Sequence, residues 1–93
     1  MIKVSVIYPV YNSENYIELS LESLMQQTLE DIEIIILDDG STDSSLEVIK
    51  AVLTRNPLRR DQVVLVSREN KGVSATRQEG VDLATGEYLI HMD

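Results

Sequence analysis

The sequence contains no cysteine and only one histidine, His91, among its 93 residues. Without cysteine the chain has no disulfide framework and no thiolate chemistry. One histidine excludes a multi-histidine metal site and disfavours a Ser-His-Asp triad. Because His91 lies near the end of a strand-like segment, we interpret it as a packed or edge residue.

Basic residues are scarce: 8 Lys and Arg stand against 16 Asp and Glu, giving a formal net charge of -8. An acidic surface repels the phosphates of nucleic acids and the headgroups of anionic membranes. No apolar run approaches the roughly 20 residues of a membrane span, and the N-terminus lacks a secretory signal pattern. We therefore expect no nucleic-acid partner and a cytoplasmic location, leaving open a peripheral membrane position for a full-length protein.

The glycine-rich phosphate-binding loops are absent, since no Gly-x-Gly-x-x-Gly or Gly-Lys-Ser/Thr motif occurs. A nucleotide would then be recognised by a carboxylate, with its diphosphate neutralised by a divalent metal on carboxylates. Asp39 is a candidate acceptor for the N–H of a pyrimidine, and Tyr11 is a candidate stacking partner. Asp93 could contact a ribose hydroxyl or a metal.

Segments with strand character alternate with segments of helical periodicity. The predicted strands are residues 3–10, 32–37, 63–66 and 87–92, and the predicted helices are 13–27, 44–55 and 73–85. Continuous apolar strands are typical of a parallel sheet covered on both faces. The order β-α-β-α-β-α-β therefore predicts an α/β fold with three layers: a mainly parallel sheet between helices.

Prolines and glycines refine these boundaries. Pro9 cannot donate to a strand ladder, so the first strand should end near Tyr8. Residues 58–61 read as a surface loop. Gly80 interrupts the helical propensity of 73–85 and indicates close packing on the sheet, whereas Gly86 should stop that helix.

Two adjacent carboxylates, Asp38 and Asp39, follow the apolar run 34–37. The carboxyl ends of parallel strands are where open α/β sheets bind ligands. Gly40 allows the sharp turn, and Asp43 suits an N-cap of the next helix. The pair could serve only this connection, with Asp38 bonding the turn, or it could leave Asp39 for a ligand; both interpretations stay open.

Five segments together resemble the family-2 glycosyltransferases, which have the A-type glycosyltransferase fold. They are residues 4–12 (VSVIYPVYN), 23–28 (SLMQQT), 38–43 (DDGSTD), 70–77 (NKGVSATR) and 86–93 (GEYLIHMD). The resemblance covers essentially the whole chain. It departs from the family at 76–78, where Thr-Arg-Gln replaces the usual Ala-Arg-Asn, and the chain ends before the second aspartate of an Asp-x-Asp motif.

The resemblance implies a Rossmann-like nucleotide-sugar-binding part, usually for a uridine nucleotide. Carried over by position, the nucleotide-sugar-binding residues are Pro9, Val10, Tyr11, Asn12, Asp39, Arg77 and Asp93. Asp39 would accept the uracil N3–H, and Asp93 would be the first metal-binding aspartate, holding Mn or Mg weakly. Simpler roles remain open: Tyr11 packing on the sheet edge, Arg77 in a surface ion pair, and Ser74 and Asn70 capping the helix.

The resemblance further implies that residues 1–93 are the N-terminal donor-binding subdomain of an inverting glycosyltransferase, cut short before the metal and acceptor regions. The full-length protein would transfer a sugar from a nucleotide donor to an acceptor hydroxyl; the fragment would bind the donor at most. An alternative is a non-catalytic nucleotide-binding or interaction module. Apolar surface left uncovered should also promote self-association.

Overall fold

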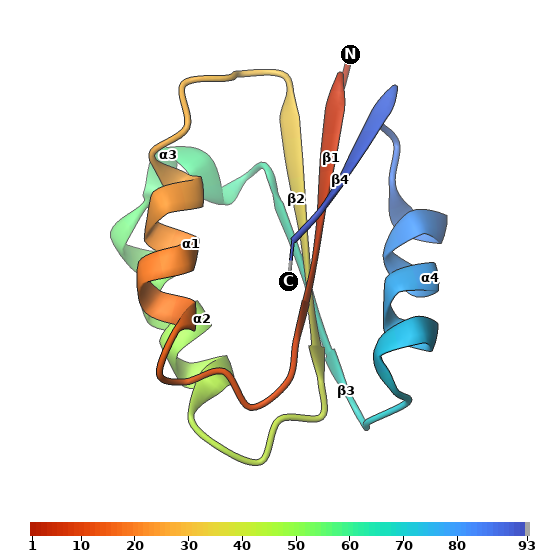
Figure 1. Cartoon of the computed structure of the whole chain (residues 1–93). Helices are drawn as coiled ribbons and strands as arrows, with labels where there is room; N and C mark the ends of the chain where they lie inside the picture. The colour runs from red at the N-terminus through yellow and green to blue at the C-terminus, as the bar shows by residue number, and fades with distance from the viewer. Residues whose placement is uncertain (93) are drawn as a thin grey trace.

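The computed structural model describes residues 1–92 and has four parallel strands in one sheet. The strands are β1 (Val4–Val10), β2 (Ile32–Asp39), β3 (Val63–Arg68) and β4 (Tyr88–His91), in the spatial order β3-β2-β1-β4. The helices are α1 (Ile17–Met25), α2 (Ser45–Arg55), α3 (Pro57–Arg60) and α4 (Val73–Leu83). Helices α1 and α2 cover one face and α4 covers the other (Figure 1), which confirms the predicted three-layer α/β fold. Within residues 1–92, no helix has the length and apolar character needed to cross a membrane.

The main core lies between the sheet and the α1/α2 layer. Helices α1 and α2 each bury an apolar stripe with helical spacing against the sheet. The buried stripe residues are Ile17, Leu21, Leu24, Met25, Ile49, Val52 and Leu53. They pack against alternate residues of β1 and β2. The helical spacing on α1 and α2 and the two-residue spacing on the strands therefore define the two apolar faces that meet in this core.

The opposite face carries a smaller core of Ile7, Ile35 and Leu37 beneath α4. Gly80 of α4 is buried against this cluster. The predicted close approach of α4 to the sheet is therefore confirmed.

Helix α1 begins at Ile17, four residues later than predicted. Residues 13–16 form a turn in which Ser13 O accepts the N–H groups of Tyr16 and Ile17, at 2.9 and 2.8 Å. The N–H groups of Ser13 and Glu14 donate outward to Ser45 Oγ and an Asp43 carboxylate oxygen. The segment is thus fixed by the start of α2, which explains why the regular helix begins only after it.

Strand β1 continues through Pro9 to Val10, so the prediction that it ends near Tyr8 was wrong. Successive backbone groups of a strand point to opposite neighbours. Ile7 O accepts from Met92 N on the β4 side, so Pro9, two residues further along, points its missing N–H to that same side. Pro9 therefore costs no bond to β2, with which β1 stays paired as far as Val10.

Residues 57–60, predicted largely as loop, form the short helix α3. Pro57 occupies its first turn, where a fixed φ and a missing N–H are tolerated.

Helix α4 ends at Leu83 and not at Thr85 as predicted. The backbone of the next residue, Ala84, is already extended.

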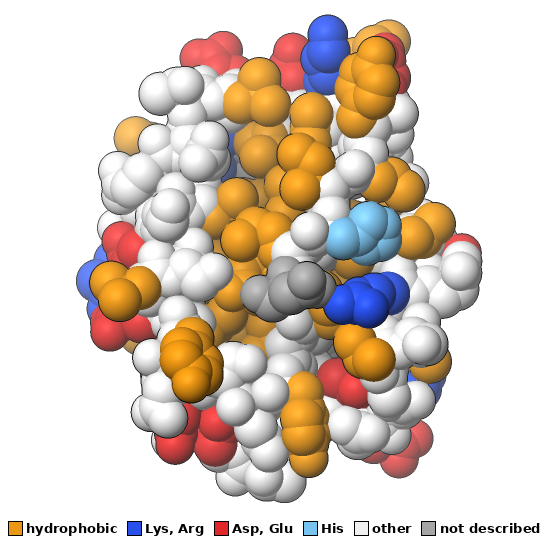
Figure 2. Space-filling view, viewed as in Figure 1, with side chains coloured by type: hydrophobic (Ala, Val, Ile, Leu, Met, Phe, Trp, Pro, Cys, Tyr) orange, Lys and Arg blue, Asp and Glu red, His pale blue; other side chains and the backbone are white. Residues whose placement is uncertain are grey.

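Strand β4 forms one edge of the sheet, and all four of its residues are exposed. Tyr88, Leu89 and Ile90 are 61%, 42% and 50% exposed. Figure 2 shows apolar side chains gathered between the α1/α2 layer and the α4 layer. The structure therefore has the uncovered apolar surface that was predicted.

Candidate functional site

Asp38 and Asp39 are the last two residues of β2, which extends two residues beyond the predicted end. The extension follows from pairing on both sides: Asp38 lies beside Val10 of β1 and Ser67 of β3, and Asp39 lies beside Arg68. Both carboxylates are buried, at 3% and 4% exposed. The sheet therefore holds two acidic groups at the edge where open α/β proteins bind ligands.

Asp38 serves the strand-to-helix connection. One of its oxygens accepts the N–H of Ser41 at 3.2 Å, and the other accepts the Ser67 hydroxyl at 3.1 Å. Gly40, between these residues, has φ of +71°, a conformation that residues with a Cβ rarely adopt. The predicted turn roles of Asp38 and Gly40 agree with this geometry.

Asp39 organises the approach to α4. Its Oδ1 accepts the Lys71 N–H at 2.8 Å and a bond from the Arg68 guanidinium, and its Oδ2 accepts the Gly72 N–H at 3.1 Å. These bonds satisfy backbone donors that precede the helix. The prediction that Ser74 and Asn70 cap α4 was wrong: α4 has no side-chain cap at its N-cap residue, and the Asn70 amide donates to Asp39 O instead.

The environment of Asp39 favours its ionised form. Burial alone would raise the pKa of its carboxyl group. The bonds from the Lys71 N–H and the Arg68 guanidinium outweigh burial and hold the pKa below its ordinary value. Asp39 is thus an ionised hydrogen-bond acceptor at neutral pH.

A cavity of about 70 Å³ opens beside Asp39 at the carboxyl ends of β1 and β2. It is lined by Pro9, Val10, Tyr11, Asp39, Val73 and Thr76. Four of the residues predicted to bind a nucleotide therefore meet in one place. Tyr11 and Val73, at 52% and 53% exposed, flank it, so apolar surface lies next to a buried carboxylate.

The other three predicted site residues are not among those lining this cavity. Asn12 has φ of 48° and accepts the N–H groups of Thr42 and Asp43, at 2.8 and 3.4 Å, so it holds the β2–α2 connection. Arg77 is half-buried on α4, directly after Thr76. Asp93 lies outside the described residues.

Sequence reasoning missed Arg68, Val73 and Thr76. Thr76 is fully buried and donates to Gly72 O at 2.8 Å, while also accepting from Arg68 at 3.1 Å. β3 was predicted to end at Val66, which left Arg68 in a turn. The predicted topology could have indicated Arg68. Because β3 is parallel to β2, the carboxyl ends of the two strands lie side by side, and an arginine at the end of β3 can reach Asp39.

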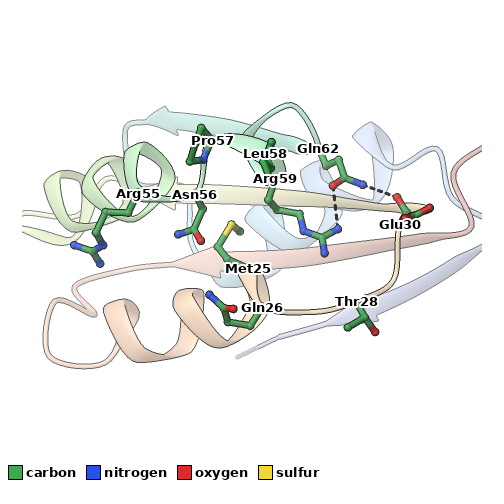
Figure 3. A pocket seen from close by; sticks show the side chains of 10 residues that line it. All are labelled: Met25, Gln26, Thr28, Glu30, Arg55, Asn56, Pro57, Leu58, Arg59 and Gln62. Carbon is green, nitrogen blue, oxygen red and sulfur yellow. Dashed lines mark hydrogen bonds between the residues drawn. The ribbon is translucent and has the colours of Figure 1, made fainter.

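A larger cavity of about 500 Å³ lies at the opposite end of the strands, near the amino ends of β2 and β3 (Figure 3). Several of its polar side chains, among them Arg59, Gln62 and Asn56, hold neighbouring segments together. Arg59 donates to Leu29 O at 2.8 Å and to Gln62 at 2.9 Å, and the Asn56 amide donates to Val52 O at 2.8 Å. We interpret this hollow as a structural junction between loops.

Across residues 1–92 there is no group of three or more His, Cys, Asp or Glu side chains that could hold a metal ion. The described residues therefore do not fit a metal centre by themselves. The predicted metal ligand, Asp93, is not among them.

The parallel sheet, the acidic strand ends and the cavity beside them define an α/β domain with a candidate ligand site at its carboxyl edge. Comparison with known sequences identifies the family of this domain. The chain belongs to glycosyl transferase family 2, whose family model matches residues 5–93. The resemblance stated from the sequence motifs is thereby confirmed.

Individual relatives agree with this family. The glycosyltransferase GlyA of Streptococcus pneumoniae is 38% identical over 91 residues, covering 98% of this chain and 12% of that protein. The uncharacterized glycosyltransferase YibD of Escherichia coli is 41% identical, covering 98% of this chain and 25% of YibD. The chain thus spans a quarter or less of the length of these two relatives.

Solved structures share the fold. The mannosyltransferase PcManGT of Pyrobaculum calidifontis, in complex with GDP-Man and Mn²⁺, aligns with a TM-score of 0.84 and 27% identity over 94% of this chain and 26% of that chain. TarS 1–349 of S. aureus, in complex with UDP, aligns with a TM-score of 0.76 and 31% identity over 99% of this chain and 27% of that chain. The matches establish the A-type glycosyltransferase fold for this domain.

Proposed function

We propose that residues 1–93 form the donor-nucleotide subdomain of a glycosyltransferase that uses a nucleotide diphosphate sugar. The observation that carries this proposal is the meeting of Pro9, Val10, Tyr11 and Asp39 around one cavity. Membership of the family and the UDP and GDP-Man complexes of similar structures support it.

The uracil ring is the part of the donor that this site would recognise. Asp39 is buried and ionised, so it would accept the N3–H of uracil, and half-exposed Tyr11 would contact the ring face. The cavity of about 70 Å³ is smaller than the roughly 300–1,000 Å³ of complete ligand sites. It would receive the edge of the base, with the rest of the nucleotide lying outside it.

The remaining predicted residues would act around this pocket. Asn12 would shape its rim by holding residues 42 and 43, and Arg77 would approach the nucleotide from α4. Asp93 would provide the first carboxylate of an Asp-x-Asp motif for Mn or Mg. The Mn²⁺ in the complex of the similar mannosyltransferase supports a divalent metal in the whole enzyme.

In the full-length protein, we propose transfer of the sugar to an acceptor hydroxyl with inversion at the anomeric carbon. A carboxylate beyond this chain would deprotonate the acceptor. The protein would work in the cytoplasm, where nucleotide donors are made, or at the cytoplasmic surface of a membrane. The subdomain alone would bind the donor without transferring the sugar.

Calorimetric titration of the chain with UDP, with and without Mn²⁺, tests the proposal. Tyr11→Ala should weaken UDP binding at least about fivefold, since stacking on a base contributes roughly 1–3 kcal/mol. Asp39→Asn should remove binding, whereas Asp61→Asn, in an exposed turn, should leave it unchanged. Equal UDP affinity in all four proteins would contradict the site and favour a module with another ligand.

A further inference from the structure

Arg68, the last residue of β3, uses its whole guanidinium group in bonds to the protein. Nη1 donates to Asp39 Oδ1 and to Glu69 O, and Nη2 donates to Glu79 Oε1 and Thr76 Oγ1. Nε donates to Glu79 Oε1 at 2.9 Å. Five donors are all that an arginine side chain possesses, so the plane of this group is fully determined.

The charges around Arg68 make this arrangement more than a surface contact. Its side chain is 15% exposed, and those of Asp39 and Glu79 are 6% and 32% exposed. Two carboxylates, one on β2 and one on α4, therefore meet at one mostly buried cation. Without the cation they would repel each other and Asp39 would lose its main charged partner.

The bonds to Asp39 leave it with a defined remaining capacity. An ionised carboxylate has about four acceptor positions, two on each oxygen. Oδ1 is occupied by Arg68 and the Lys71 N–H, and Oδ2 accepts the Gly72 N–H. The Thr76 hydroxyl also lies beside this carboxylate, but its single proton is donated to Gly72 O. The acceptor position that remains is therefore on Oδ2, and Asp39 lines the cavity that carries the candidate site.

An acceptor held in one orientation discriminates between nucleobases. Uracil presents a ring N–H at N3, which an ionised carboxylate can accept. Cytosine presents an unprotonated N3 at the same place, and its lone pair would oppose the carboxylate. A site built around a fixed hydrogen bond rejects an analogue that cannot form it, because the buried polar group is then left unpaired.

We propose that Arg68 is a positioning residue for nucleobase recognition: by occupying Asp39 Oδ1 it leaves Oδ2 as the acceptor and so sets the preference for uracil over cytosine. This inference rests on the proposed function. Glu79 supports the same role, because it fixes the guanidinium from the α4 side.

The test measures the affinities of UDP and CDP for the full chain by calorimetry, and takes their ratio. Arg68→Gln should lower the preference for UDP at least about fivefold, and Arg68→Lys, with three donors instead of five, should give an intermediate ratio. Glu79→Gln keeps Arg68 but weakens its second anchor, so it should lower the ratio by a smaller factor. Arg60→Gln, an exposed arginine of α3, is the matched control and should match wild type.

The ratio separates a positioning role from a structural one. If Arg68 only fastens β3 to α4, its variants will lose affinity for UDP and CDP equally and the ratio will not move, which overturns the inference. If Arg68→Gln does not give a cooperative thermal unfolding transition, Arg68→Lys and Glu79→Gln decide by the same ratio. A wild-type chain without preference for UDP would instead contradict the proposed function itself.

Discussion

Gly80 of α4 lies directly against Ile7 of β1: a Cβ added at Gly80 would stand 2.5 Å from Ile7 Cγ2. The same Cβ would meet Leu37 at 3.2 Å. The absence of a side chain therefore sets how closely α4 packs on the sheet, and with it the position of Thr76 and Val73 beside the cavity.

Gly80→Ala should destabilise the chain although alanine is the better helix former. Propensity alone would stabilise by about 1 kcal/mol, but overpacking a closed interface typically costs about 1–3 kcal/mol. Ala75→Gly, at an exposed position of the same helix, provides the comparison and should lose about 1 kcal/mol from propensity. Urea unfolding measures both, and a Gly80→Ala protein more stable than wild type would contradict the packing described.

Asn12 should matter for stability through its backbone as well as its side chain. Asn12→Ala removes an acceptor of two N–H groups and places alanine at φ of 48°. We expect a loss of roughly 1.5–3 kcal/mol, from the hydrogen bond and the strained conformation together. Asn12→Gly loses the same hydrogen bonds, but glycine adopts the positive φ without strain. Its stability in thermal unfolding should therefore lie between those of Asn12→Ala and wild type. The reverse ranking would contradict the positive φ.

Glu33 should contribute stability that acid removes. Its carboxylate accepts bonds from Ser5 and Thr85, tying the start of β1 to the turn before β4. Burial would raise the pKa of Glu33, but these bonds lower it below its ordinary value of 4.5. A lowered pKa means that the contribution is complete above the unfolded value and is lost as the pH falls through the folded one.

The comparison of wild type with Glu33→Gln isolates this contribution. At pH 7 the variant should be less stable by on the order of 1 kcal/mol, the usual net value of one hydrogen bond. The difference should shrink towards pH 3. Glu87→Gln, at an exposed position nearby, is the matched control for the loss of one negative charge. A difference independent of pH would contradict the role of the ionised carboxylate.

Uncovered apolar residues of β4 should cause the chain to self-associate. Ile90 pairs with Val6 of the main core, so it extends the apolar face of the α1/α2 side beyond the helices. Ile90→Lys should reduce association measured by analytical ultracentrifugation, whereas Leu58→Lys, 97% exposed on α3, should not. A monomer mass at every concentration of wild type would contradict this prediction.

The alternation of apolar strands and amphipathic helices was sufficient to predict the fold. Burial of one or both faces of an element requires apolar residues at regular spacing, and that spacing can be seen in the sequence. The site was only partly predictable. Adjacent carboxylates at a strand end pointed to Asp38 and Asp39, but the sequence could not say how the two divide their roles. That division depends on Arg68 and on the Lys71 and Gly72 N–H groups, which are distant along the chain from Asp39 and reach it only through parallel pairing of β2 and β3.

The predicted ends of helices and strands were wrong where contacts between distant segments overrode the local conformational preference. The first turn predicted for α1 is instead fastened to Asp43 and Ser45. Pro9 continues a strand because its missing N–H points away from β2, the strand with which it is paired. Neither circumstance leaves a local pattern in the sequence.

The most direct test of the nucleotide site is a backbone amide NMR titration of the chain with UDP. The account predicts that the largest shifts fall on Tyr11, Gly72 and Val73, around the smaller cavity. The larger cavity at the opposite end of the strands provides an internal control through Gln26, Arg59 and Gln62, which should not respond. Shifts confined to those three residues, or no shifts at saturating UDP, would contradict a nucleotide site at the carboxyl ends of β1 and β2.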